Sequence, residues 1–177
     1  MLILTELPDK LSNQLLFDDE AWQHAMVCDL NTASIFWNRA ALICLPKVYT
    51  TEATAAFLYL LQKESKFLGL WKQEWGNRTP TINDFLQKLI TWGRFTRMEG
   101  KAIPVEEFWK RYIATINGML AEPGFEYQEE GSVKPFRNRL VKEEIEQVIC
   151  FDEEWNEQNY FIETKAEWIL YNWVTMA

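Results

Sequence analysis

Histidine and cysteine are scarce in this sequence of 177 residues, which has one histidine and three cysteines. A single histidine, His24, cannot supply a multi-histidine metal site. Cys28, Cys44 and Cys150 are odd in number, far apart and flanked by apolar residues, which argues against a disulfide framework or a cysteine-built metal site. We therefore expect reduced thiols, no metal, no cofactor and a cytoplasmic location.

Catalytic motifs are also lacking. The seven glycines form no G-x-G-x-x-G fingerprint, and the sequence has no nucleophile elbow, no zinc-protease helix motif and no phosphate-binding loop. His24 lies between Trp22 and Met26, a setting more typical of a hydrogen-bonded packing residue than of a catalyst. The sequence predicts a protein that is not an enzyme.

The sequence also lacks long apolar runs, and its basic residues are fewer than its acidic ones. No stretch approaches the roughly 18 apolar residues that span a membrane. The opening residues MLILTELPDK lack the basic region of a secretory signal, so none is expected. Eighteen basic residues against 26 acidic ones give a net charge of −8, which disfavours binding to nucleic acid or to anionic membranes.

What is present is typical of an ordinary globular chain with many aromatic residues. The composition is 48% hydrophobic and 25% charged, and we see no internal repeat or linker, so residues 1–177 are expected to form one domain. Nine Trp, eleven Phe and six Tyr can fill a core, although Trp and Tyr also anchor interfaces.

Two central helices carry clear local signals. Thr81 followed by Asp84 predicts a capped helix start, and the apolar residues after it recur at helical spacing. A second helix is expected from Pro104 to the stop at residues 123–124, with Trp109 buried in the middle of its apolar face.

The N-terminal third is less decisive. Asp18 could cap a helix with an apolar face that reaches Leu30. Residues 34–49 are ambiguous between helix and strand. Residues 51–62 predict a helix that continues or restarts as far as Gly76.

The C-terminal third favours strands. Residues 125–127 and 145–151 have extended character, residues 152–159 form a polar connection, and residues 160–163 and 168–175 predict a hairpin. Both sides of the last segment are largely apolar, so we expect a covered strand inside a sheet. The alternative is that one side is a docking surface. The predicted fold is α+β, with helices of the N-terminal and central region packed on a C-terminal antiparallel sheet of about three to four strands.

One group of residues suggests metal chemistry. Asp152 precedes an apolar run that ends in Glu163 and Lys165. This arrangement resembles the core of restriction-endonuclease-like nucleases, and the resemblance implies that the two carboxylates hold a divalent metal while the lysine helps activate water. The resemblance covers only residues 152–165. Only twelve residues follow Lys165, and they favour a strand, whereas that family needs more sheet and a further helix.

Two classes of function therefore remain open. The first is a non-catalytic interaction protein, such as an adaptor, an accessory subunit or an immunity-type inhibitor, that uses aromatic anchors with an acidic rim. Its partner would be another protein, and a second copy of the chain would also qualify. The candidate contacts are Arg137, Arg139, Trp155 and Trp173. The second class is a metal-dependent hydrolase or nuclease centred on Asp152, Glu163 and Lys165.

Overall fold

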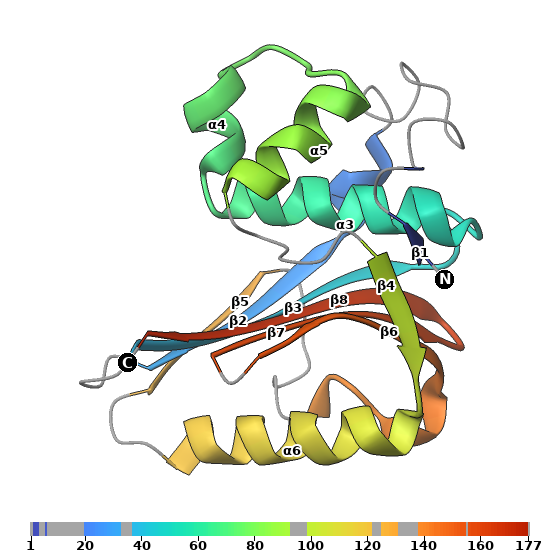
Figure 1. Cartoon of the computed structure of the whole chain (residues 1–177), viewed down its shortest axis with the longest axis vertical. Helices are drawn as coiled ribbons and strands as arrows, with labels where there is room; N and C mark the ends of the chain where they lie inside the picture. Colours follow the sequence, from blue (N-terminus) through green and yellow to red (C-terminus); the bar gives the residue numbers. More distant parts are fainter. Residues whose placement is uncertain are drawn as a thin grey trace.

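An antiparallel β-sheet forms the centre of the molecule (Figure 1). The computed structural model describes residues 2–3, 6, 20–32, 37–92, 99–121, 125–130, 138–154 and 156–176. Within these ranges eight strands pair in the order β1-β4-β6-β7-β8-β3-β2-β5, and each pairing is antiparallel. The strands are β1 (Leu2–Ile3), β2 (Met26–Thr32), β3 (Trp37–Pro46), β4 (Glu99–Ile103), β5 (Phe125–Glu130), β6 (Ile145–Glu153), β7 (Glu157–Thr164) and β8 (Glu167–Met176).

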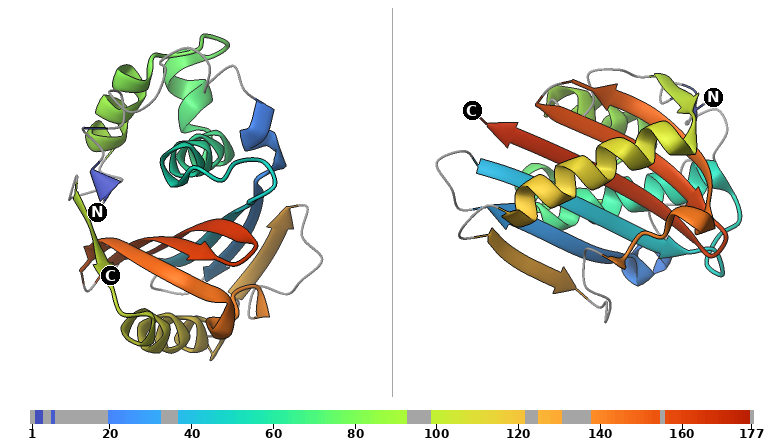
Figure 2. Two further views of the ribbon diagram at one scale, coloured as in Figure 1. Left: turned by 90° about the vertical axis from the view of Figure 1, so that its right-hand side faces the viewer. Right: turned by 90° about the horizontal axis from the view of Figure 1, so that it is seen from below.

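Helices cover both faces of this sheet, as the two views of Figure 2 show. The described helices are α3 (Ala53–Phe67), α4 (Leu70–Trp75), α5 (Ile82–Thr91) and α6 (Val105–Ala121), with short 3-10 turns η2 (Glu20–His24) and η4 (Lys142–Glu144). Helix α3 lies on one face, with α4 and α5 stacked on its far side, and α6 lies on the opposite face. The α+β class is therefore confirmed. None of the helices in the described ranges is long and apolar enough to cross a membrane.

Helix α3 is enclosed because it has neighbours on two sides. Residues 55–65 are all buried, as expected of a helix that lies between a sheet and an outer helical layer. The helix ends before Gly69, whose φ of 75° is in the left-handed region that favours glycine. Helix α5 begins as predicted, since the Asp84 amide donates to Thr81 Oγ1 at 3.1 Å and the Thr81 hydroxyl donates to Asp84 Oδ2 at 2.7 Å.

The prediction of a covered C-terminal strand is confirmed. β8 lies between β7 and β3, so it has a hydrogen-bonded neighbour along both edges. Trp168 and Leu170 contribute to the core beneath α3, whereas Ile169 and Tyr171 contribute to the core beneath α6. Burial on both faces explains why the strand has no polar side.

The extent of the sheet corrects the sequence prediction. The helix expected to run from Asp18 to Leu30 is wrong over its described part, because η2 leads directly into β2. The ambiguous residues 34–49 contain β3, so strands from the N-terminal region join the C-terminal ones. In β2, Val27 faces α3 while Cys28 and Leu30 face α6. A strand that is apolar on both faces does not show the alternation that identifies a strand in a sequence.

Two details also differ. The polar connection is shorter than expected, because β6 extends to Glu153 and β7 begins at Glu157. In α6, Trp109 is only partly buried, and the centre of the buried face is Phe108, with an exposed fraction of 0%. The buried positions of this helix are Phe108, Tyr112, Ile116 and Met119.

Candidate functional site

A row of polar side chains crosses the α3 face of the sheet. Five residues are directly opposite one another in register on five successive strands, and all except Ala41 are polar: Asp29, Ala41, Asn172, Asn159 and Asp152. We call this set the polar row. All five are buried, with exposed fractions of 6% or less. Polar residues are rarely placed in a core unless they are hydrogen-bonded, so their alignment needs an account.

A β-bulge brings Asp152 into this row. Its neighbour Phe151 already faces α3, so regular alternation would turn Asp152 toward α6. The register shifts between Cys150 and Asp152, as in a bulge that adds a residue to one strand. The Asn159 side chain donates from Nδ2 to Asp152 Oδ2 at 3.1 Å. The shift therefore places a carboxylate among the polar residues of the α3 face.

Each asparagine amide in this region donates to a carboxylate. Asn172 Nδ2 donates to Glu64 Oε1 on α3 at 2.6 Å. Asn159 Nδ2 donates to Glu157 Oε1 at 2.7 Å as well as to Asp152. In both amides Nδ2 is the donor, so the other polar atom, Oδ1, is an acceptor oxygen. Asn172 Oδ1 is buried and has no hydrogen-bond partner in the structure.

One arginine offsets part of the negative charge. Arg39 Nε donates to Asp29 Oδ1 at 2.6 Å, and its guanidinium lies 5.4 Å from the ring centre of Phe67. Among the described residues, four carboxylates belong to this region together with one guanidinium: Asp29, Glu64, Asp152 and Glu157, with Arg39. The described side chains of the region are therefore rich in acceptor oxygens.

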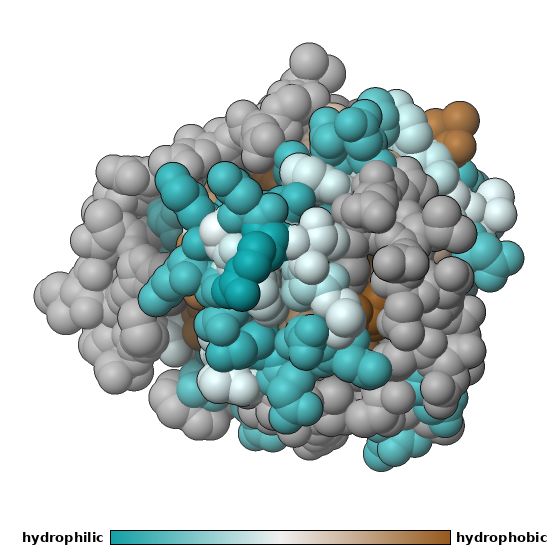
Figure 3. Space-filling model, turned by 90° about the horizontal axis from the view of Figure 1, so that it is seen from above, coloured by the Kyte–Doolittle hydropathy of each residue, from teal (hydrophilic) through white to brown (hydrophobic). Residues whose placement is uncertain are grey.

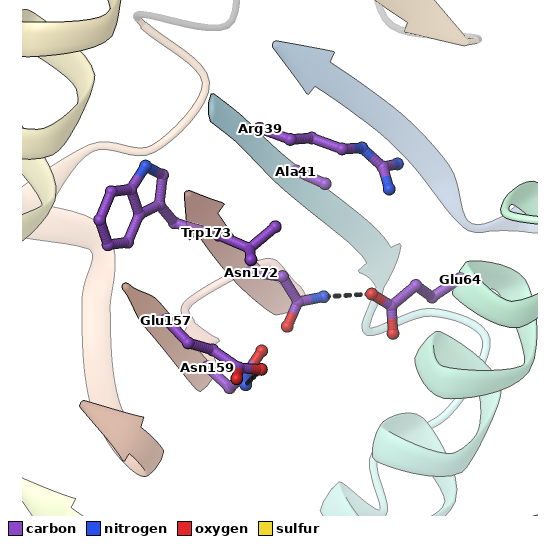
Figure 4. Close-up of a pocket in the computed structure, with 8 residues that line it drawn as sticks. Arg39, Ala41, Glu64, Glu157, Asn159, Asn172 and Trp173 are labelled. Carbon is purple, nitrogen blue, oxygen red and sulfur yellow. Dashed lines mark hydrogen bonds between the residues drawn. The ribbon is translucent and has the colours of Figure 1, made fainter. Parts of the chain in front are cut away.

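A pocket opens over the middle of the polar row, where the small Ala41 leaves space. Its enclosed part is small, with room for about one water molecule, and its walls come from β3, β7, β8 and α3. Figure 4 shows Asn172 between Glu64 on one side and the Glu157–Asn159 pair on the other, with Arg39 beyond Ala41. Trp173 and Val174 complete the lining.

The three residues of the nuclease-like pattern do not converge. Asp152 is opposite Asn159, and Glu163 is four residues further along β7, a separation of about 13 Å in an extended strand. Glu163 instead accepts a 2.8 Å hydrogen bond from Lys47 Nζ, and Lys165 is exposed in the turn before β8. Burial works against the charged Lys47 side chain, but its hydrogen bonds to Glu163 and Glu146 outweigh this and raise its pKa. In the described part of the chain no group of three or more His, Cys, Asp or Glu residues has the arrangement of a metal site.

The four predicted partner contacts have different outcomes. Arg137 and Trp155 lie outside the described residues. Arg139 is buried, with an exposed fraction of 6%, and its Nη2 donates to Glu167 Oε1, at the start of β8, at 2.7 Å. Burial opposes its charge, but the bond to Glu167 raises its pKa. Trp173 is partly buried and borders the pocket, so it remains beside a candidate site.

Most described aromatic side chains contribute to packing. Trp71, Trp75 and Trp92 cluster with Phe85 between α4 and α5 at centroid separations of 5.1–5.8 Å. Among the described residues the large apolar side chains left exposed are Val48, Tyr49 and Val141. Seen from above in Figure 3, the described surface is largely hydrophilic, with brown atoms in small separate patches. The described ranges therefore show no broad aromatic docking surface.

Lys66, in the last turn of α3, is a charged residue packed against aromatic rings. Lys66 Nζ is 3.4 Å from the ring centre of Trp22 and 4.7 Å from that of Trp71. Burial, with a smaller contribution from Lys63, lowers the pKa of Lys66 to about 8. The two indole rings offset part of the cost of burying this charge.

Sequence reasoning missed the polar row. A signal was present, since Asn172 interrupts an apolar strand that was expected to be covered on both faces, and a covered asparagine requires partners. Those partners could not be named, because Glu64 is 108 positions away in the chain.

The chain was compared with protein-family models, with curated proteins and with solved structures, and none of them matched. The site must therefore be interpreted from its own geometry.

Proposed function

We propose that this chain is a non-catalytic interaction protein that binds a positively charged region of another protein. The observation that supports this proposal is the pocket on the α3 face, which is lined by the carboxylates of Glu64 and Glu157 and by the Asn172 amide, with Arg39 as the cation among its described lining residues. Asp29 and Asp152 lie beside it in the polar row. The net charge of −8 acts in the same direction, because an acidic protein attracts basic partners over a distance.

This version of the interaction hypothesis differs from the one based on aromatic anchors. Trp71 and Trp168 are buried, and the other tryptophans with described side chains pack against the two cores. An acidic pocket can select a basic partner and speed its association without a large aromatic patch, because charge complementarity mainly sets specificity and the association rate. The alternative of a metal-dependent hydrolase has no comparable support, because Asp152 on β6 lies opposite Asn159, four residues along β7 from Glu163.

Salt-dependent complex formation tests the proposal. The tagged chain would be added to an extract of its native cells and chromatographed at low ionic strength and again at about 0.5 M salt, where exposed charges are screened. We expect a stoichiometric complex with a basic protein at low salt, and its dissociation at high salt. A chain that elutes alone at low salt, or whose partner is acidic and insensitive to salt, would contradict the proposal.

A further inference from the structure

We propose that the pocket between Asn172, Glu64 and Glu157 is a binding site for a primary ammonium group, of the kind that a lysine side chain carries. The inference rests on the proposed function for the source of that group, a basic partner protein. The chemistry of the pocket can be tested without the partner.

The orientation of Asn172 gives the first reason. Its Nδ2 donates to Glu64 Oε1 at 2.6 Å, and turning the amide over would place two acceptor oxygens against each other. Asn172 Oδ1 is thereby held facing the Glu157–Asn159 pair (Figure 4). The residue has an exposed fraction of 6%, and this oxygen has no partner. A buried acceptor without a donor destabilises the fold, so a ligand that brings an N–H group would recover that free energy.

The second reason is the number and kind of groups around the hollow. Asn172 on β8, Glu64 on α3 and Glu157 on β7 present acceptor oxygens from three different elements. A primary ammonium has three N–H donors and no acceptor, and its fourth substituent is a carbon that can leave through the open mouth. The nearby Arg39 guanidinium donates from Nε to Asp29 Oδ1 at 2.6 Å.

Size favours an ammonium over a guanidinium. The enclosed part of the hollow has room for a group about as large as one water molecule. An ammonium is a compact point charge of that size, whereas a guanidinium is a wide planar fork. The pocket therefore fits the end of a lysine better than the end of an arginine.

The unmodified chain provides the first test. Methylammonium chloride would be titrated while NMR records the side-chain amide signals of Asn172 and Asn159, with tetramethylammonium chloride, guanidinium chloride and potassium chloride at equal ionic strength. We expect saturable shifts with methylammonium and only small, non-saturating shifts with the other three salts. Equal binding of tetramethylammonium or potassium would overturn the inference, because neither has an N–H donor. Tighter binding of guanidinium would overturn it too.

A matched pair of variants provides the second test. Glu157→Gln removes the charge but keeps an oxygen that can accept from Asn159, and it should weaken methylammonium binding by about tenfold or more, since hydrogen bonds to charged groups are the stronger ones. Glu163→Gln removes a carboxylate from the same strand outside the pocket, where it pairs with Lys47, and should leave binding unchanged. Equal weakening in both variants would overturn the inference. If Glu157→Gln does not fold, the salt series on the unmodified chain still decides.

Two further ligands identify the source of the ammonium group. A lysine blocked at its α-amino and carboxyl groups should bind more tightly than methylammonium if a protein side chain is the ligand, and equal binding would point to a small free amine. Acetylation of the ε-amino group should abolish binding. A salt-sensitive complex with a basic partner that Glu157→Gln leaves unchanged would overturn this inference but not the proposed function. Saturable methylammonium binding without any such complex would support the inference and remove the proposed function.

Discussion

Asn172, on the last strand of the sheet, donates a 2.6 Å hydrogen bond to Glu64 in the enclosed helix α3, although the two residues lie 108 positions apart in the chain. The exposed fraction of Asn172 is 6% and that of Glu64 is 3%. This contact joins the helical layer to the sheet through polar atoms, beside the apolar core beneath α3. It also fixes which atom of Asn172 faces the pocket.

Loss of this contact should be costly. We expect Asn172→Ala to lower the free energy of unfolding by about 1–3 kcal/mol, because it removes a donor from a buried carboxylate. Chemical denaturation measures the change. The exposed Asn83 on α5 provides a control, and Asn83→Ala should change stability by no more than about 0.5 kcal/mol. If Asn172→Ala and Glu64→Ala are additive in the double variant, the two side chains are not coupled in the way the structure shows.

The buried face of α6 leads to a second prediction. Phe108→Ala should cost about 3–5 kcal/mol, because this ring is fully buried against Tyr160 and Tyr171. Trp109→Ala should cost clearly less, since Trp109 is only partly buried. Urea denaturation of the two variants gives the comparison. A larger loss for Trp109→Ala would restore the helix orientation predicted from the sequence.

Removal of the last ten residues should unfold the protein. The truncation deletes nearly all of β8, which pairs with both β7 and β3. Each large buried side chain contributes roughly 1.5–3 kcal/mol, against a total stability of about 5–15 kcal/mol. Expression of residues 1–167 followed by thermal unfolding is the measurement. A soluble fragment with a cooperative transition would show that β8 is dispensable and would revive its interpretation as a docking segment.

Lys66 should make stability rise with pH in the alkaline range. Its pKa is about 8 in the folded chain against an ordinary value of 10.5, so between these two values the unfolded chain holds a proton that the folded chain has released. Folding is then favoured by increasing pH. We expect the stability difference between the unmodified chain and Lys66→Gln to shift in favour of the unmodified chain from pH 8 to pH 10. A difference independent of pH would contradict the lowered pKa. The buried tyrosines contribute equally to both proteins and cancel.

The separation of Asp152 and Glu163 predicts that the chain does not cleave nucleic acid with the help of a metal. Asp152 lies opposite Asn159, and Glu163 is four residues, about 13 Å, further along the neighbouring strand β7. Carboxylates so placed cannot both bind a Mg²⁺ ion whose ligands lie at about 2.0–2.1 Å. Incubation with DNA and with RNA in the presence of Mg²⁺ or Mn²⁺ is the assay. Cleavage that is lost in Glu163→Ala and in Lys165→Ala, with folding retained, would contradict this expectation.

Local patterns in the sequence determined the elements whose stabilising contacts are close in the chain. The capping pair Thr81–Asp84 and the helical spacing before Pro123 predict α5 and α6, and two apolar runs across residues 164–167 predict the β7–β8 hairpin. These signals depend on neighbours within about four positions on a helix or across a short turn, which the sequence displays directly. Cys28, Cys44 and Cys150 are all buried, and none of them forms a disulfide bond.

The tertiary structure alone decided the membership of the sheet and the location of the candidate site. β2 and β3 are covered on both faces, so their composition does not distinguish a strand from a buried helix. The polar row exists because five strands align in register and a bulge turns Asp152 onto the α3 face. Register and bulges depend on pairing between distant segments, and a shift of one residue would move every side chain of a strand to the other face. The sequence contains Asn172 and Glu64, but only the packing of α3 on the sheet brings them together and opens a pocket beside them.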